Sequence, residues 1–318
     1  MTASPETPVW TGPARFLPPP EPVVRADGAR HFSGVTYAAP AGYRPLQLDV
    51  LVPATPIPAP LVVWIHGGAW MLGDRRYLPE TLRPNQLFDE LLAAGLAVAT
   101  IDYRHAAEAA FPAQLHDAKA AVRYLRAHAD VLGLDVSRIG VWGESAGGHL
   151  AALIGLTAPH SVREGVDLEG VDLEGTVGVV GPSSAVDVVV DWYGVSDLTT
   201  QPRMTPPPEV AALLPPELLL PPEDLLLVGL DDAARAAASP LVHVTADAPP
   251  FLLVHGTADW LVPYAQSETL ATALEAAGVP VELVPVEGAD HIVLGCADID
   301  AVVRLSVDYL ANTLLERN

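Results

Sequence analysis

The chain alternates between short continuous apolar runs and segments whose apolar residues recur every three or four positions. Such runs, ending in glycine or a polar residue, predict strands buried on both faces, here at 61–68, 96–104, 138–143, 186–194, 250–256 and 281–288. HFSGVTYAA and LQLDVLV, nearer the start, predict an opening pair of strands. Helical spacing recurs at 115–125, 270–277 and 299–314. This alternation predicts an α/β fold with a doubly wound, mostly parallel sheet.

Composition narrows the classes of partner that the chain can have. The 318 residues carry a formal net charge of −22, which disfavours nucleic acid and anionic membrane surfaces. Cys296 is the only cysteine, so no disulfide can form within the chain. The first residues do not read as a secretory signal, and no apolar run reaches the roughly 18 residues of a membrane span. We therefore expect a cytoplasmic protein.

The stretch GVWGESAGGHL, residues 140–150, places Ser145 among four glycines. It follows a predicted strand, precedes an Ala/Leu-rich helix start, and contains the pattern G-x-S-x-G of a nucleophile elbow. Gly143 and Gly147 would remove side chains that clash across the sharp turn, and the helix N-terminus favours developing negative charge. The alternative is a tight strand–helix turn with an incidental serine. We interpret Ser145 as a nucleophile.

A serine hydroxyl needs a base that is oriented by an acid, and this architecture orders them serine, acid, histidine. His291 follows the last predicted strand, and Asp259 follows the strand before it. Both should emerge with Ser145 at the carboxyl edge of the sheet. Asp197, after the strand that follows the elbow, is the rival acid. His255 is interpreted as structural.

The segment IHGGAW, residues 65–70, predicts the donors for a developing oxyanion. Gly67 and Gly68 can bring backbone N–H groups close to the substrate, and the N–H of Ala146 completes the oxyanion hole. Trp70, at the mouth of this loop, and Glu144, beside the nucleophile, are candidate substrate contacts, although simple packing is an equal alternative for each.

These motifs resemble the α/β-hydrolase family, and within it carboxylesterases of the hormone-sensitive-lipase-like and bacterial feruloyl-esterase-like groups. HGGAW, GESAGG, WYGVSDL, HGTADWLVP and GADH carry the resemblance, which spans roughly residues 35–315. It implies a serine esterase without cofactor or metal that cleaves short to medium acyl or aryl esters of small molecules. Ala69 departs from relatives with a third glycine, so we expect a narrower pocket. Arylformamidases, and binding proteins of this fold that have lost catalysis, are alternative functions.

Three segments stand outside this pattern. Residues 1–30 are rich in proline and predict an extended arm before a catalytic domain at 31–318. Residues 198–240 combine proline breaks with leucine clusters, which predicts an inserted lid. We expect its Leu213, Leu214, Leu218 and Leu219 to form an apolar wall of the pocket. The repeat GVDLEGVDLEG, residues 165–175, predicts a solvated acidic loop. The sequence leaves open whether the chain forms a homo-oligomer.

Overall fold

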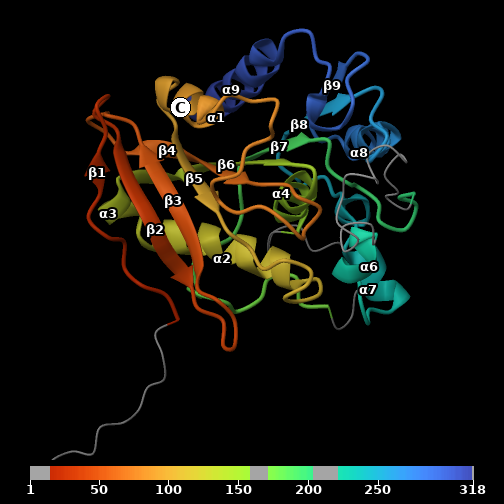
Figure 1. The fold of residues 1–318 in the computed structure, drawn as a ribbon, viewed down its shortest axis with the longest axis horizontal. Helices are drawn as coiled ribbons and strands as arrows, with labels where there is room; N and C mark the ends of the chain where they lie inside the picture. Colours follow the sequence, from red (N-terminus) through yellow and green to blue (C-terminus); the bar gives the residue numbers. More distant parts are fainter. Residues whose placement is uncertain (1–14, 158–170, 203–220, 317–318) are drawn as a thin grey trace, which may run out of the picture.

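A single twisted sheet forms the centre of the protein in the computed structural model, which describes residues 15–157, 171–202 and 221–316 (Figure 1). Within these residues nine strands pair in the order β1-β2-β3-β5-β4-β6-β7-β8-β9. The pairs β1–β2, β2–β3 and β3–β5 are antiparallel. All the other pairs, from β5–β4 to β8–β9, are parallel. The strands are β1 (Val23–Val24), β2 (Arg30–Ala38), β3 (Leu46–Val52), β4 (Ala59–Ile65), β5 (Ala97–Ile101), β6 (Leu134–Glu144), β7 (Val188–Trp192), β8 (Phe251–Gly256) and β9 (Val281–Val286).

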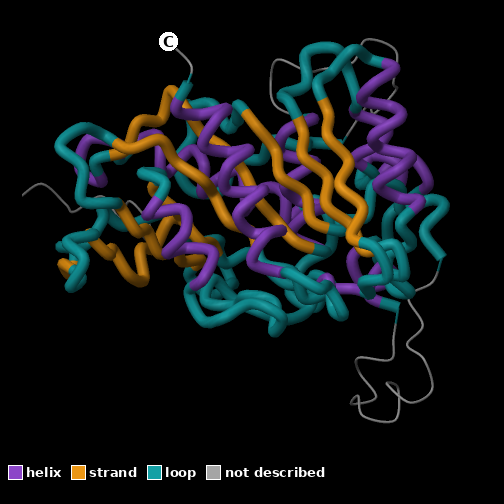
Figure 2. Tube along the Cα trace, turned by 90° about the horizontal axis from the view of Figure 1, so that it is seen from above, coloured by secondary structure: helices purple, strands orange, loops and turns teal. Residues whose placement is uncertain are grey.

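Helices cover both faces of this sheet. One apolar cluster joins the sheet to α1 (Gln86–Ala93) and α9 (Ile299–Leu315). The cluster on the other face includes α2 (Ala113–Ala127), α4 (Ala146–Leu156) and α8 (Ala265–Ala276). The turned view of Figure 2 shows the strands side by side across the molecule, with helices and loops around them. The remaining helices are α3 (Ala129–Leu132), α6 (Pro222–Leu226), α7 (Asp232–Ala237) and the 3₁₀ turns η2 (Pro240–His243) and η3 (His291–Val293).

The predicted doubly wound, mostly parallel sheet is confirmed, and each expected strand has an observed counterpart. All seven residues of β4 are buried, as a continuous apolar run between two helical layers requires. The helices expected at 115–125, 270–277 and 299–314 correspond to α2, α8 and α9. Every helix in the described ranges is too short or too polar to cross a bilayer.

The described part of the proline-rich arm lies against the domain. Leu17 receives a hydrogen bond at its carbonyl from the hydroxyl of Tyr124, and its own N–H donates to the carbonyl of Thr36. Strand β1 then pairs with β2. The described part of the predicted arm therefore adds a short edge strand to the same sheet.

The predicted lid is described only in part. Residues 203–220 lie outside the described ranges, and with them the expected pocket residues Leu213, Leu214, Leu218 and Leu219. The described remainder forms α6 and α7, and Leu226 and Leu227 near the end of α6 are buried in the cluster that contains α2 and α4.

Of the predicted acidic loop, residues 165–170 lie outside the described ranges, and Glu174 is partly solvated, with 37% of its side chain exposed, but also binds basic side chains. Its carboxylate lies 3.1 Å from Nζ of Lys119, which is fully buried, and it also pairs with Arg123. Lys119 further donates to the carbonyl of Thr157 at the end of α4. A buried ammonium group needs such partners because water cannot solvate it. The acidic segment is thus tied to the core through Glu174.

Candidate active site

Ser145 lies on a strained turn between β6 and α4. Its φ of 53° and ψ of −120° are unusual for a residue with a side chain, and its N–H donates to the carbonyl of Trp192 over 2.8 Å. A Cβ atom on Gly143 would lie 2.1 Å from the carbonyl oxygen of Gly147, and one on Gly147 would lie 2.0 Å from that of Ile65. The two glycines are therefore required by close backbone contacts around the serine.

The structure brings Ser145, His291 and Asp259 together. Nε2 of His291 lies 3.0 Å from Oγ of Ser145, and Nδ1 lies 2.7 Å from Oδ2 of Asp259. The other carboxylate oxygen of Asp259 accepts from the backbone N–H groups of Leu261 and Val262, each over 2.9 Å. The carboxylate is thus fixed in place, and it determines which histidine nitrogen faces the serine.

A second histidine helps to keep the carboxyl of Asp259 ionised. Burial opposes ionisation of this carboxyl, but hydrogen bonds from His255 and His291 outweigh burial and hold the pKa of Asp259 well below its ordinary range. Nε2 of His255 lies 3.2 Å from Oδ2 of Asp259 and 2.8 Å from the carbonyl of Val262, and Nδ1 lies 2.7 Å from Oγ of Ser267. His255 ties the turn after β8, where the sequence placed it, and its contact with Asp259 was not foreseen.

The rival acid, Asp197, is occupied elsewhere. Its carboxylate accepts from the backbone N–H of Thr199 and from the hydroxyls of Thr199 and Thr200, which makes it a local turn cap. Asp290 accepts from the backbone N–H of its neighbour His291, so its side chain supports the histidine loop rather than the imidazole. Among the candidates from the sequence, only Asp259 contacts the ring of His291.

The loop that carries His291 is itself strained. Ile292 and Val293 have φ values of 55° and 51°, a conformation that β-branched residues rarely adopt. The hydroxyl of Thr81 donates to the carbonyl of Ile292 over 2.8 Å, and the ring of Tyr193 meets that of His291 at 5.0 Å between centroids. Such strain persists where the surrounding contacts fix the backbone, and it is concentrated at functional sites.

The oxyanion prediction needs one correction. The N–H of Gly67 does not face the site, because it donates to Oε1 of Glu144 over 2.6 Å. Gly68 has a φ of 97°, and a Cβ there would lie 2.4 Å from the carbonyl of Leu72. Within the described residues, the N–H groups of Gly68, Ala69 and Ala146 donate to no protein acceptor. These three are the candidate oxyanion donors.

Glu144 is fully enclosed beneath this loop. Burial raises the pKa of its carboxyl to about 7, against the opposing effects of His291, the Gly67 N–H and the Tyr193 hydroxyl. The Tyr193 hydroxyl is buried near Glu144 without a well-aligned hydrogen-bond partner among the described residues. Glu144 borders the pocket, but its hydrogen bond is to the oxyanion loop, so the packing alternative accounts for its position.

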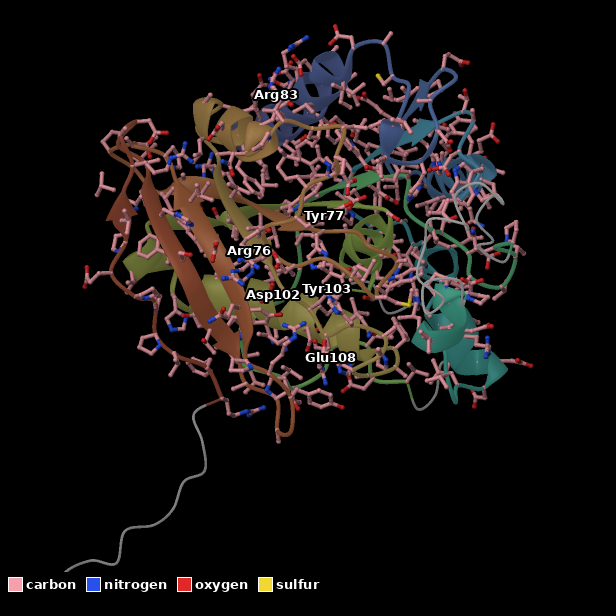
Figure 3. The ribbon with its side chains drawn as sticks, viewed as in Figure 1. Arg76, Tyr77, Arg83, Asp102, Tyr103 and Glu108 are labelled. Atoms are coloured by element: carbon pink, nitrogen blue, oxygen red, sulfur yellow. The ribbon has the colours of Figure 1, made fainter. Side chains whose placement is uncertain are left out.

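Ser145 opens into a cavity of about 190 Å³. Its walls include the apolar side chains of Leu72, Val195 and Leu261 together with Tyr77. In the view of Figure 3, Tyr77 lies near the middle of the picture, with Tyr103 below it. Trp70 also borders the cavity, although its indole N–H donates to Nδ1 of His149. In the described part of the chain, no group of three or more His, Cys, Asp or Glu residues could hold a metal ion.

Comparison with curated proteins identifies related esterases and ester hydrolases. Esterase LipC of Mycobacterium tuberculosis is 33% identical over 219 residues, which cover 69% of this chain and 49% of LipC. Probable carboxylic ester hydrolase LipM of the same organism is 33% identical over 209 residues, covering 66% of this chain and 43% of LipM. The chain spans about half the length of the curated relatives it matches.

Solved structures match over most of the chain. A truncated carbohydrate esterase from gut microbiota has a TM-score of 0.75 at 29% identity, covering 94% of this chain and 100% of that one. Propionate-bound esterase 2 of Thermogutta terrifontis has a TM-score of 0.65 at 28% identity, covering 87% of this chain and 94% of that one.

The predicted α/β-hydrolase fold is confirmed. A family model described as TAP-like protein matches residues 232–318, and one described as BD-FAE matches residues 48–274. The BD-FAE match covers more than half of the chain, which therefore belongs to the BD-FAE family within the α/β hydrolases.

Proposed function

We propose that this protein hydrolyses carboxylic esters of small molecules through an acyl-enzyme formed on Ser145. The observation that carries the proposal is the continuous hydrogen-bonded path from Ser145 through His291 to Asp259. It opens into a cavity beside backbone N–H groups that have no acceptor among the described residues. That combination supplies a nucleophile, a base, an orienting acid and oxyanion donors in one place. The similar esterases and ester hydrolases support it.

The proposed reaction follows from the geometry. Nε2 of His291 takes the hydroxyl proton as Oγ of Ser145 bonds to the ester carbonyl carbon. The carbonyl oxygen gains negative charge and is stabilised by the N–H groups of Gly68, Ala69 and Ala146. The carbon–oxygen bond to the alcohol then breaks, and the alcohol leaves with the proton from Nε2. Water attacks the acyl-enzyme in the same manner, releases the acid and restores the serine.

The size and lining of the cavity support esters with a short acyl group. About 190 Å³ is below the usual range for drug-sized ligands, and the walls formed by Leu72, Val195 and Leu261 suit an alkyl chain. A carbohydrate esterase and a propionate-bound esterase among the similar structures support testing acetylated sugars and short-chain esters first.

The test compares turnover of p-nitrophenyl acetate, butyrate and octanoate by the wild-type protein and Ser145→Ala. The variant should lose about 10⁶-fold in kcat while it keeps the wild-type melting temperature, because only the nucleophile is removed. Residual activity above a few per cent would refute the role of Ser145. N-formylkynurenine is included as a substrate, and turnover of this amide with no ester turnover would favour the arylformamidase alternative.

Binding of the esters without turnover by the wild-type protein would favour the non-catalytic alternative. A cytoplasmic location stays a prediction, which cell fractionation with a specific antibody would test. The oligomeric state is equally open to a mass measurement at several protein concentrations.

A further inference from the structure

A buried polar path connects the oxyanion loop, residues 66–70, with the end of helix α7. The indole N–H of Trp70 donates to Nδ1 of His149 over 3.2 Å. Nε2 of His149, in the second turn of α4, lies 2.7 Å from the carbonyl oxygen of Ala238, directly after α7. Both side chains are fully buried, and their rings meet edge to face at 5.2 Å. No triad residue takes part in these contacts.

The two contacts fix the state of the imidazole. An indole N–H can only donate and a carbonyl can only accept, so Nδ1 of His149 is the acceptor and Nε2 carries the proton. Burial lowers the pKa of His149 to about 4, against the effect of the Ala238 carbonyl, so the ring is neutral at neutral pH. Position 149 therefore requires a side chain that accepts a hydrogen bond from Trp70 and donates one to Ala238.

The backbone that His149 supports is strained. Ala69 and Trp70 have φ values of 54° and 56°, in the left-handed region that side-chain-bearing residues avoid. The carbonyl of Trp70 accepts from the N–H of Ala106 over 2.7 Å, and the N–H of Gly67 is held by Glu144. The Tyr103 hydroxyl also donates to the carbonyls of His66 and Gly67, and the N–H groups of Met71 and Leu72 donate to that of Gly68. For the side chain of Trp70, the contact with His149 is the only hydrogen bond among the described residues. Without it, the strained segment of Ala69 and Trp70 loses the polar anchor of its side chain and can shift.

We propose that His149 is a positioning residue which, through the indole of Trp70, holds the N–H groups of Gly68 and Ala69 toward the oxyanion site above Ser145. His149 touches no substrate in this arrangement. The inference rests on the proposed ester hydrolysis, because oxyanion donors matter only in acyl transfer. Donors of this kind act within a narrow range of distance, so a small displacement of the loop weakens transition-state binding.

Two substitutions separate the two contacts of the ring. An asparagine side chain places its oxygen near the position of Nδ1, so His149→Asn still accepts from Trp70 but loses Ala238. A glutamine side chain reaches the position of Nε2, so His149→Gln still donates to Ala238 but offers no acceptor to Trp70. Trp70→Phe removes the same hydrogen bond from the other side. His243→Gln is the matched control, because Nε2 of His243 contacts the neighbouring carbonyl of Ala237 and not the oxyanion loop.

We expect His149→Gln and Trp70→Phe to lower kcat about 10- to 100-fold with KM unchanged, less than the 10²–10³-fold cost of deleting a donor outright. His149→Asn and His243→Gln should stay within about threefold of wild-type kcat. The double variant Trp70→Phe/His149→Gln should lose no more kcat than the more impaired of the two single variants, because both changes remove the same contact. Rates are expressed per competent site, counted by titration with a phosphonylating agent, so that unfolded protein does not contribute.

Wild-type kcat per site in His149→Gln overturns the inference, as do equal losses in His149→Asn and His149→Gln. A loss confined to melting temperature or to the number of titratable sites also overturns it, because it shows a purely structural role. A wild-type protein that turned over no ester would refute the proposed function first and this inference with it.

Discussion

Asp191, on the strand that follows the elbow, is a buried carboxylate outside the triad. It is 1% exposed, and its Oδ1 accepts from the N–H of Gly194 over 2.9 Å. The same oxygen lies so near α4 that a Cβ on Gly148 would come within 2.2 Å of it. Burial raises the pKa of Asp191 from 3.8 to about 7, against the Gly194 N–H and the charge of His255. The folded protein therefore holds this proton more tightly than the unfolded chain.

The sign and size of the effect on stability follow from that difference. A group whose folded pKa is raised contributes stability that is fully present below the unfolded pKa and is lost as pH rises through the folded pKa. With pKa values of 3.8 unfolded and about 7 folded, ionisation of Asp191 costs about 2.5 kcal/mol more at about pH 8 than at about pH 5. Asp191→Asn cannot ionise, and its side-chain oxygen can still accept from Gly194.

The assay is urea unfolding of the wild type and Asp191→Asn at several pH values between about pH 5 and pH 8. The free energy of unfolding of the variant minus that of the wild type should rise by about 2.5 kcal/mol across this interval. Asp308→Asn on the exposed side of α9 is the matched control, and its difference should change by less than about 0.5 kcal/mol. A difference for Asp191→Asn that stays constant with pH would refute the assignment of a raised pKa.

Four further substitutions test the site. Asp259→Asn should lower kcat by about 10⁴-fold in the ester assay and Asp197→Asn by less than about tenfold, and the reverse ranking would move the acid to Asp197. Gly147→Ala should cost at least about 3 kcal/mol in unfolding experiments, because its Cβ would meet the Ile65 carbonyl; wild-type stability would contradict the close contact. Glu144→Gln should lose more kcat at about pH 8 than at about pH 6, because the wild-type carboxylate ionises near pH 7 beside His291, and equal losses would contradict this.

Periodicity predicted the sheet and its main helices because both depend on which faces are buried. Strand β4 is apolar throughout and is enclosed by two helical layers, whereas the apolar residues Leu115, Ala118, Val122 and Leu125 of α2 follow helical spacing, although most residues of this helix are buried. Helix α1 was not predicted, although Leu87, Phe88 and Leu91 have the spacing of a buried helical face. Prolines at 79 and 84 precede this short segment, and they obscured its helical pattern.

The three triad residues were predictable because the fold fixes where strand ends lie. Once Ser145, Asp259 and His291 are assigned to the ends of three parallel strands, β6, β8 and β9, they must share one edge of the sheet. The direction of an individual N–H group has no such signature. Gly67 and Gly68 are adjacent glycines in one motif, yet one N–H is bound by Glu144 and the other is unpaired among the described residues.

The glycines of HGGAW and GESAGG also allow these two segments to pack closely against each other. Strands β4 and β6 are neighbours, with Ile65 opposite Gly143. A Cβ on Gly147 would meet the Ile65 carbonyl, and a Cβ on Gly67 would lie 2.2 Å from Oε1 of Glu144. Gly67 needs no unusual φ, so its lack of a side chain is explained by the Glu144 carboxylate. The oxyanion loop and the elbow are therefore fitted to each other, and a change in either motif should be tolerated only with a compensating change in the other.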